Sequence, residues 1–333
     1  MRAFVVTAPG EGGVQDVPEP VAGPGDVVVE VERAGVCGTD VEFWTGEQAY
    51  LRQGLASYPL RLGHEWAGTV SSTGDGVDPA WVGRRVTGDT MLGDGTCRRC
   101  RRGHQHVCGQ RQEVGILGDR PGALAERLAV PARSLHVLPG TVDPVVGALV
   151  EPGGNALRAA QATGGGPGDR VLVVGPGTIG VLTALFLRAA GAEVHLLGVT
   201  APSLAFARAL GFAADVTVPA LPFDAVVDAS TDAATPARAL GLVEPAGRVV
   251  LIGLATTAST LDTRSLVLGD VTAVGVLSAS PGLAATVAAY AAGTVDPRPL
   301  VAATVGLDGV GDVLAGRRPA GAGPKVQVDP ALR

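Results

Sequence analysis

The sequence predicts an α/β protein in which a doubly wound parallel sheet is inserted into a β-rich domain, and three observations support this. A β-branched apolar run at 171–174 leads at once into a glycine-rich turn and a helical pattern. Strand and helix patterns alternate from there to about residue 276, as in a parallel sheet covered by helices. Residues 1–150 carry short strand patterns punctuated by glycines, which is typical of a β-rich domain.

The tail of the chain is too short to be a domain by itself. It carries helical patterns at 283–292 and 308–315 and a strand pattern at 325–328. We therefore expect the tail to fold back onto the N-terminal part, so that the parallel-sheet domain interrupts the β-rich one. The expected domains are 1–150 with 285–333, and 151–284.

The glycine-rich turn has the G-x-G-x-x-G spacing of a dinucleotide-binding turn. Gly175 permits the tight bend, Gly177 lets the backbone approach a pyrophosphate, and Gly180 lets helix and strand pack closely. The N-terminus of the following helix supplies free N–H groups and the positive end of a dipole. The alternative is a glycine-rich turn without a ligand. The candidate cofactor residues here are Gly175, Pro176, Gly177, Thr178, Ile179 and Gly180.

The position that usually binds the cofactor's ribose holds no acid. A carboxylate that bonds the 2′-hydroxyl is expected roughly 20 residues after the glycines, where this chain has Gly198. Its absence removes repulsion toward a 2′-phosphate, to which Thr200 and Ser203 can donate hydrogen bonds. We therefore expect NADP or NAD as the cofactor, with NADP favoured.

Composition and charge argue against several classes of function. The chain is 46% hydrophobic and 17% charged, which is typical of a compact globular protein. No run approaches the ~18 apolar residues that span a bilayer, and the first residues already read as a strand, which argues against a signal peptide. A net charge of −6 does not indicate the positively charged surface that binds nucleic acid. We expect a cytoplasmic protein with no membrane or nucleic-acid partner.

Two groups of residues have the types that bind metals. Cys37, His64 and Glu151 each end an apparent strand or lie near glycines, and a thiolate, an imidazole and carboxylates make a tetrahedral zinc site. Taken singly, they also read as a small buried residue, a core histidine and a surface acid. The other cysteines indicate metal binding before disulfide bonding in a cytosolic chain. They are Cys97, Cys100 and Cys108.

Together these motifs resemble those of the zinc-dependent medium-chain alcohol and polyol dehydrogenases, over essentially the whole chain. Glu151 stands where other alcohol dehydrogenases have a cysteine, which favours the sorbitol, threonine and glucose dehydrogenase branch. The resemblance implies a GroES-like catalytic domain and a Rossmann cofactor domain. The segments that carry it, besides the cysteine array and the glycine turn, are Gly35-Val36-Cys37-Gly38-Thr39-Asp40, Leu62-Gly63-His64-Glu65, Val150-Glu151-Pro152 and Gly323-Pro324-Lys325-Val326.

The resemblance implies a catalytic zinc held by Cys37, His64 and Glu151. Glu65 would lie close enough to coordinate or exchange. Lys325, the only lysine, would pair with Glu65 whenever that glutamate is off the zinc.

Three further residues acquire roles from the same resemblance. Asp40 would orient the imidazole of His64, since a ligating imidazole needs its other nitrogen held. Thr39 would pass the substrate proton outward. Glu42 stands where many relatives have a histidine, so the outer part of this proton path departs from the family pattern.

The second metal site also departs from its pattern, because relatives present four cysteines there. The position three before Cys97 is Asp94, which is an acceptable zinc ligand. We expect Asp94 to complete a structural zinc site with the three cysteines. His104 and His106 are alternative ligands.

The leading functional interpretation is a zinc-dependent NAD(P) oxidoreductase. It would oxidise a secondary alcohol of a sugar, polyol or aminocyclitol, or reduce the ketone. The alternatives are a zinc dehydrogenase for simple or amino alcohols, similar to threonine dehydrogenase, and a dinucleotide-binding protein without catalysis. Zinc-free quinone or enoyl reductases share the fold but do not need Cys37, His64 and Glu151 together. The family implies a homodimer or homotetramer.

Overall fold

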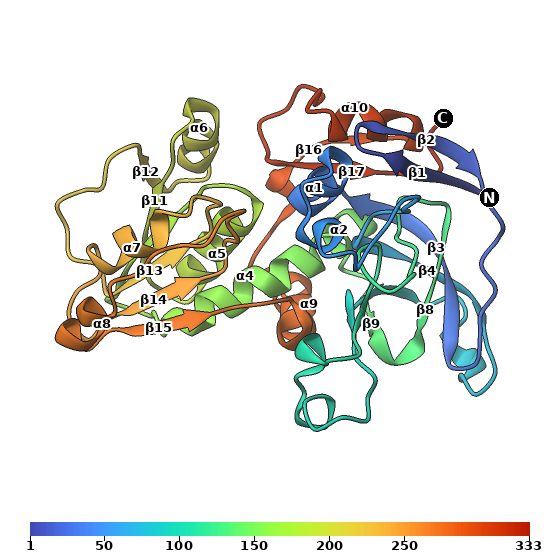
Figure 1. Cartoon of the computed structure of the whole chain (residues 1–333), viewed down its shortest axis with the longest axis horizontal. Coiled ribbons are helices and arrows are strands. Elements are labelled where there is room, and N and C mark those ends of the chain that lie inside the picture. The colour runs from blue at the N-terminus through green and yellow to red at the C-terminus, as the bar shows by residue number, and fades with distance from the viewer. The chain divides into compact units, whose positions relative to one another are not determined.

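The computed structural model describes all residues, 1–333, and the chain divides into two compact units. The β-rich unit comprises Met1–Glu151 and Leu283–Arg333, and the parallel-sheet unit comprises Pro152–Gly282. In Figure 1 the blue and red ends of the chain both belong to the β-rich unit. No helix of the chain is long and apolar enough to cross a membrane.

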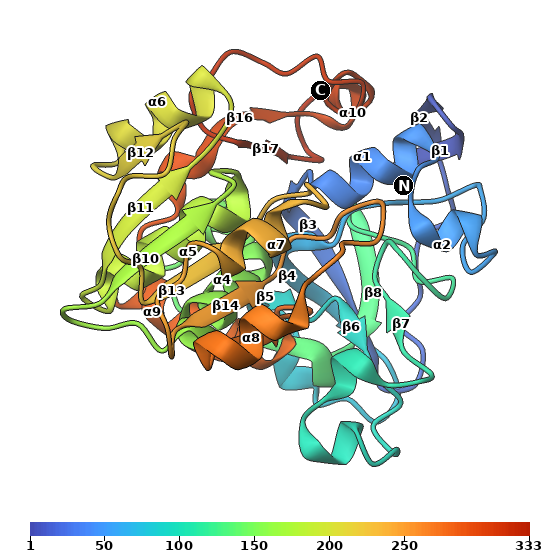
Figure 2. The ribbon, with the colours of Figure 1, turned by 60° about the vertical axis from the view of Figure 1, so that its left-hand side comes forward.

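Six parallel strands form the sheet of the parallel-sheet unit, in the order β12-β11-β10-β13-β14-β15, of which Figure 2 labels the first five. Strand order reverses between β10 and β13, which is the switch point at which such sheets bind ligands. Val171, Leu172 and Val173 of β10 are fully buried, as a continuous apolar strand requires. The predicted doubly wound sheet is therefore confirmed. Its strands are β10 (Arg170–Val174), β11 (Glu193–Leu197), β12 (Ala213–Asp215), β13 (Ala225–Asp228), β14 (Arg248–Leu251) and β15 (Thr272–Gly275).

One helix, α4, leads from the β-rich unit into this sheet, and the other helices connect its strands. Helix α5 follows the glycine turn, and its residues from Gly180 to Leu187 are all buried. Three elements are not predicted by the sequence, because their segments are short or rich in glycine: β12, α8 and the helix that begins at Val150. The helices are α4 (Val150–Thr163), α5 (Thr178–Ala189), α6 (Ala201–Ala209), α7 (Thr235–Leu240) and α8 (Thr263–Gly269).

The β-rich unit is built on a seven-stranded sheet in the order β16-β17-β3-β4-β5-β9, with β8 also paired to β3. The long strands β3 and β4 are antiparallel, and Gly35 pairs with Glu65 at one end. Strand β17 comes from the tail of the chain and pairs with β3 at the same end, Gln327 with Gly35. The strands are β3 (Asp26–Gly35), β4 (Glu65–Thr73), β5 (Arg85–Gly88), β8 (Arg127–Pro131), β9 (Leu135–Val137), β16 (Val301–Val305) and β17 (Lys325–Val328).

Smaller elements complete this unit around a core that includes the fully buried Trp66 and Phe43. The helical pattern at 308–315 becomes a 3-10 turn at Leu307–Gly309 followed by α10. These elements are β1 (Arg2–Ala8), β2 (Glu11–Asp16), α1 (Gly38–Thr45), α2 (Ala49–Arg52), β6 (Met91–Leu92), β7 (Gln112–Glu113), α3 (Pro144–Gly147), α9 (Leu283–Ala291) and α10 (Val310–Leu314).

Candidate metal centres and cofactor turn

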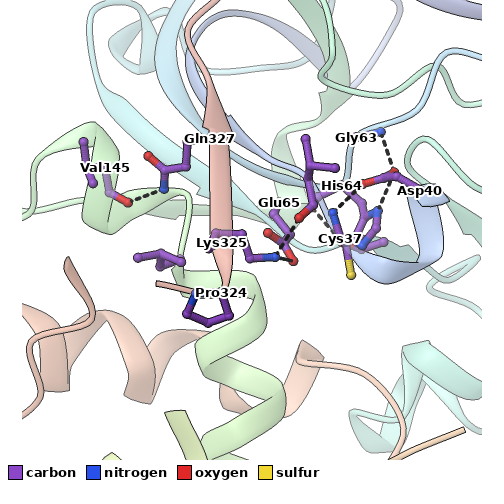
Figure 3. Close-up of polar contacts among 12 residues, drawn as sticks. Cys37, Asp40, Gly63, His64, Glu65, Val145, Pro324, Lys325 and Gln327 are labelled. Carbon is purple, nitrogen blue, oxygen red and sulfur yellow. Dashed lines mark hydrogen bonds and ion pairs between the residues drawn. The ribbon is translucent and has the colours of Figure 1, made fainter. Parts of the chain in front are cut away.

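The first candidate metal centre lies where β3 and β4 meet α1. Cys37 is the N-cap residue of α1, His64 precedes β4, and Glu65 is the first residue of β4. Their ligand atoms all lie within 4.8 Å of one another (Figure 3). The antiparallel pairing of β3 with β4 therefore brings together residues that are far apart in the sequence.

Asp40 holds this cluster from within α1. Its carboxylate accepts hydrogen bonds from the backbone N–H of Cys37 at 2.8 Å and of Gly63 at 3.3 Å. Its Oδ1 also lies 3.6 Å from Nδ1 of His64, which leaves Nε2 as the nitrogen available to a metal. Burial by itself lowers the pKa of His64, but the Asp40 carboxylate and the Cys37 thiol outweigh burial and raise that pKa well above its usual range.

Glu65 makes an ion pair with Lys325 of β17. Lys325 Nζ lies 2.7 Å from Glu65 Oε1 and also donates to the carbonyl oxygen of Val36 at 3.1 Å (Figure 3). Both residues are at most 2% exposed. Oε2 of Glu65 is buried without a hydrogen-bond partner, and a Cβ at Gly35 would lie 2.0 Å from it. Glycine at position 35 is thus required by the carboxylate.

The charges of this centre fit a divalent cation. Asp40 and Glu65 are buried carboxylates, and a Cys37 thiolate adds a third negative charge. Lys325 supplies one positive charge, so a divalent ion would balance the set, and buried charges require such compensation. Thiolate, imidazole and carboxylate are the ligand types of zinc. Cys37, His64 and the unpartnered oxygen of Glu65 would hold it.

Glu151 lies in a helix, which is a different local structure from the predicted one. The sequence predicts a strand end or a glycine-bearing turn here, but Glu151 lies in the first turn of α4. Pro152 is tolerated there because a backbone N–H in the first turn of a helix has no hydrogen-bond partner within the helix, so proline loses nothing by lacking it. Glu151 is 8% exposed, and the three ligand atoms within 4.8 Å of one another do not include its carboxylate. Its ligation of the same metal stays a prediction. Thr39, on α1, is partly buried.

The second candidate centre brings together four side chains from one loop. Ligand atoms of Asp94, Cys97, Cys100 and Cys108 all lie within 4.8 Å of one another, and this group includes neither His104 nor His106. Ligands at about 2.3 Å from a zinc ion lie about 3.8 Å apart in a tetrahedron. The Sγ atoms of Cys97 and Cys108 are 3.8 Å apart. The arrangement therefore fits zinc.

Local structure holds Asp94 in place. Its Oδ1 accepts hydrogen bonds from the backbone N–H of Thr96 at 2.7 Å and of Cys97 at 2.9 Å. These bonds hold the pKa of Asp94 well below its usual range. A Cβ at Gly93 would lie 2.6 Å from Sγ of Cys100, so glycine is needed beside the cluster.

We expect Asp94→Ala to lose the zinc ion of this loop and to lower Tm, with little change in KM, because structural zinc contributes directly to folding free energy. Zinc content and Tm of the purified variant, with and without chelator, check this. Asp94→Asn keeps the size of the side chain and isolates the lost charge. Full zinc content in Asp94→Ala would contradict the assignment and indicate His104 or His106 as the fourth ligand.

The glycine turn has the geometry that a dinucleotide requires. Gly175 has φ +95°, and a Cβ there would lie 2.8 Å from the carbonyl oxygen of Ala229. A Cβ at Gly180 would lie 2.0 Å from the carbonyl oxygen of Gly175, whereas a Cβ at Gly177 would meet nothing within 4 Å. Gly177 is the N-cap of α5 and offers no side-chain cap, so the first N–H groups of α5 are left for a ligand. Pro176, Thr178 and Ile179 complete this turn.

Gly198 follows β11, and the structure gives it a second reason to be glycine. A Cβ there would lie 2.6 Å from Cγ of Pro176 and 3.2 Å from Cδ2 of Leu204. An acid at this position would therefore displace the glycine turn itself. Thr200 Oγ1 and Ser203 Oγ lie 2.6 Å apart at the start of α6.

Comparison with known proteins finds similarity to alcohol and threonine dehydrogenases. Residues 23–140 match the family model of the alcohol dehydrogenase GroES-like domain. The chain is similar to L-threonine 3-dehydrogenases, 41% identical over 203 residues to that of Streptomyces avermitilis and 37% identical over 213 residues to that of Chelativorans sp.. These alignments cover 60% and 63% of this chain. The chain spans 57% and 60% of the length of these two relatives.

Solved structures are similar over nearly the whole chain. A candidate zinc-binding dehydrogenase from Sinorhizobium meliloti 1021, bound to NADP, is 28% identical with a TM-score of 0.89, covering 99% of both chains. Alcohol dehydrogenase TADH from Thermus sp. ATN1 is 26% identical with a TM-score of 0.90, covering 100% of both chains.

Proposed function

We propose that this chain, a member of the zinc-dependent medium-chain dehydrogenase/reductase superfamily, is an NAD(P)-dependent oxidoreductase that interconverts a secondary alcohol and its ketone. The observation that carries the proposal is the cluster of Cys37, His64 and Glu65 beside a buried lysine. A protein that only bound a dinucleotide would have no use for this cluster.

The residues around the centre suit proton transfer from an alcohol. When bound, zinc lowers the pKa of the alcohol and nicotinamide takes up its hydride. Thr39 and Glu42 are three residues apart on α1, a spacing that places two side chains on one face of a helix. Burial and the nearby Glu47 raise the pKa of Glu42, which favours its acting as a proton acceptor near neutral pH.

The carboxylates support a polar substrate. Glu65 already pairs with Lys325, but Glu42 is partly buried, and a buried carboxylate is stabilised by a donor or a positive charge. We propose a sugar, polyol or aminocyclitol. A second candidate is a hydroxy amino acid, because the curated relatives are L-threonine 3-dehydrogenases.

A substrate panel tests this proposal. The zinc-loaded protein is assayed with sugars, polyols, aminocyclitols, L-threonine, 2-butanol and benzyl alcohol, with each nicotinamide cofactor, by absorbance of the reduced cofactor. The Cys37→Ser protein gives the background. A site that bonds hydroxyls rejects analogues without them by orders of magnitude. Higher kcat/KM for the simple alcohols than for every polar substrate would overturn the substrate class.

We propose NADP as the preferred cofactor, with Thr200 and Ser203 near its 2′-phosphate. Ser203→Asp should then lower kcat/KM with NADP relative to NAD, by tenfold for each ~1.4 kcal/mol of added repulsion. Ser203→Asn is the neutral control of the same shape. Gly198→Asp is a poor test because it would move Pro176. A wild-type protein that strongly prefers NAD would contradict this proposal.

We also propose a homo-oligomer that pairs through β15. This strand is an edge of the sheet, and Thr272, Ala273 and Gly275 are exposed. Leu268 of α8 is 88% exposed nearby in the sequence. An open edge can pair with its symmetry copy.

Leu268→Lys should reduce the mass measured by light scattering, because it places two like charges at a symmetric contact. Val216→Lys is the control, since Val216 is exposed next to β12 at the opposite edge of the sheet. A wild-type monomer would contradict the proposal.

A further inference from the structure

The β-rich unit contains a pocket that none of the candidate metal ligands lines. It has a volume of about 340 Å³ and lies among β1, the loop before β4 and the loop at 115–121. A second pocket of about 520 Å³ shares Arg61 with it. Arg61 thus borders both hollows, three residues before His64.

The guanidinium of Arg61 has no partner in the protein. It makes no hydrogen bond or ion pair with any residue, and its Nε is buried. Burial lowers the pKa of Arg61 to about 10. Of its three guanidinium nitrogens only Nε is buried without a partner, and the residue as a whole is partly exposed, so the other two remain open to an anion.

The other charges of the pocket leave Arg61 uncompensated. Arg120 is already bonded, to Asp26 at 3.2 Å and to the side-chain oxygen of Gln112 at 2.9 Å. Asp119 is exposed, at φ 55° in the loop, and forms no ion pair. The remaining wall is largely apolar. It includes Val5, Leu55, Pro59, Ile116, Leu117 and Pro121.

We propose that this pocket binds a small organic carboxylate whose apolar body lies against these walls while its carboxylate pairs with Arg61. The planar guanidinium fork matches a carboxylate with two parallel hydrogen bonds. The volume is at the lower end for small-molecule sites, which limits the ligand to about the size of benzoate or hexanoate. The site requires no chemistry at the metal centre.

Calorimetric titration with benzoate tests the proposal, with neutral benzamide as the matched ligand. The protein is the full chain, wild type and Cys37→Ser, so binding is measured independently of the proposed oxidoreductase activity. We expect benzoate to bind both proteins and benzamide to bind at least about tenfold more weakly, the scale of a hydrogen bond to a charged group. Equal binding of the two ligands, or no binding of benzoate, would overturn the proposal.

Two variants locate the site. Arg61→Met keeps the length of the side chain and should weaken benzoate binding at least about tenfold. Arg238→Met, on the exposed face of α7, removes the same charge elsewhere and should change nothing. Asp119→Asn tests the pocket without touching Arg61, since asparagine tolerates the same backbone conformation, and should tighten binding by removing a like charge. Unchanged affinity in Arg61→Met, or weaker binding in Asp119→Asn, would overturn the assignment.

Discussion

Cys37→Ser is expected to abolish turnover while leaving dinucleotide binding nearly intact. The hydroxyl of serine is a far poorer zinc ligand than a thiolate, and the cluster with His64 and Glu65 loses one of its negative charges. Loss of an outer-shell partner already costs a metal site roughly 10–100-fold, so loss of a ligand should exceed that in kcat/KM. The glycine turn belongs to the other unit and is unaffected.

Three measurements check this result: turnover, zinc content and cofactor titration. Asp40→Asn is a graded control, because it weakens the orientation of His64 without removing a ligand, and its loss of activity should be smaller. Glu151→Ala tests the one predicted ligand whose carboxylate is not among the three clustered ligand atoms. If Glu151 is a zinc ligand, its variant should behave as Cys37→Ser does. Undiminished turnover in Cys37→Ser would contradict the catalytic assignment.

Lys325→Met is expected to destabilise the β-rich unit by about 3–5 kcal/mol when zinc is removed, the usual cost of breaking a buried ion pair from one side. Methionine fills a similar volume but leaves Oε1 of Glu65 without the partner it has at 2.7 Å. Bound zinc would supply the missing positive charge, so the loss should be smaller in the zinc-loaded protein. Urea denaturation with zinc and with chelator measures both values.

The double variant Lys325→Met with Glu65→Gln separates charge from packing. It removes the unpaired carboxylate charge and should recover part of the stability that Lys325→Met loses, as a coupled pair requires. Arg238→Met, on the exposed face of α7, is the control for loss of an exposed cation, and surface changes of this kind usually cost less than about 0.5 kcal/mol. A loss below about 1 kcal/mol in chelated Lys325→Met would contradict a structural role for the pair.

Features that depend on residues close together in the sequence could be predicted from the sequence. The run at 171–174 and the glycines after it specify a strand, a turn and a helix through local sterics, and the doubly wound sheet is confirmed. Cys97, Cys100 and Cys108 lie within one short loop, so their spacing indicated that they could meet, and Asp94 was added from the family resemblance. The Lys325–Glu65 ion pair, inferred from the family resemblance, is also present.

Other features depend on packing between distant segments. Glu151 lies in a helix because the apolar and alanine-rich stretch after it packs as a helix. The short glycine-rich sequence next to Glu151 does not predict that helix. The clash at Gly198 involves Pro176 and Leu204, which only the turn and α6 bring near. Arg61 borders a pocket because two loops and β1 enclose it. The sequence by itself determined the strand, turn and helix patterns and the types of ligand. Only the tertiary structure decided which ligands meet and which charges stay unpaired, because these depend on the distances between segments far apart in the chain.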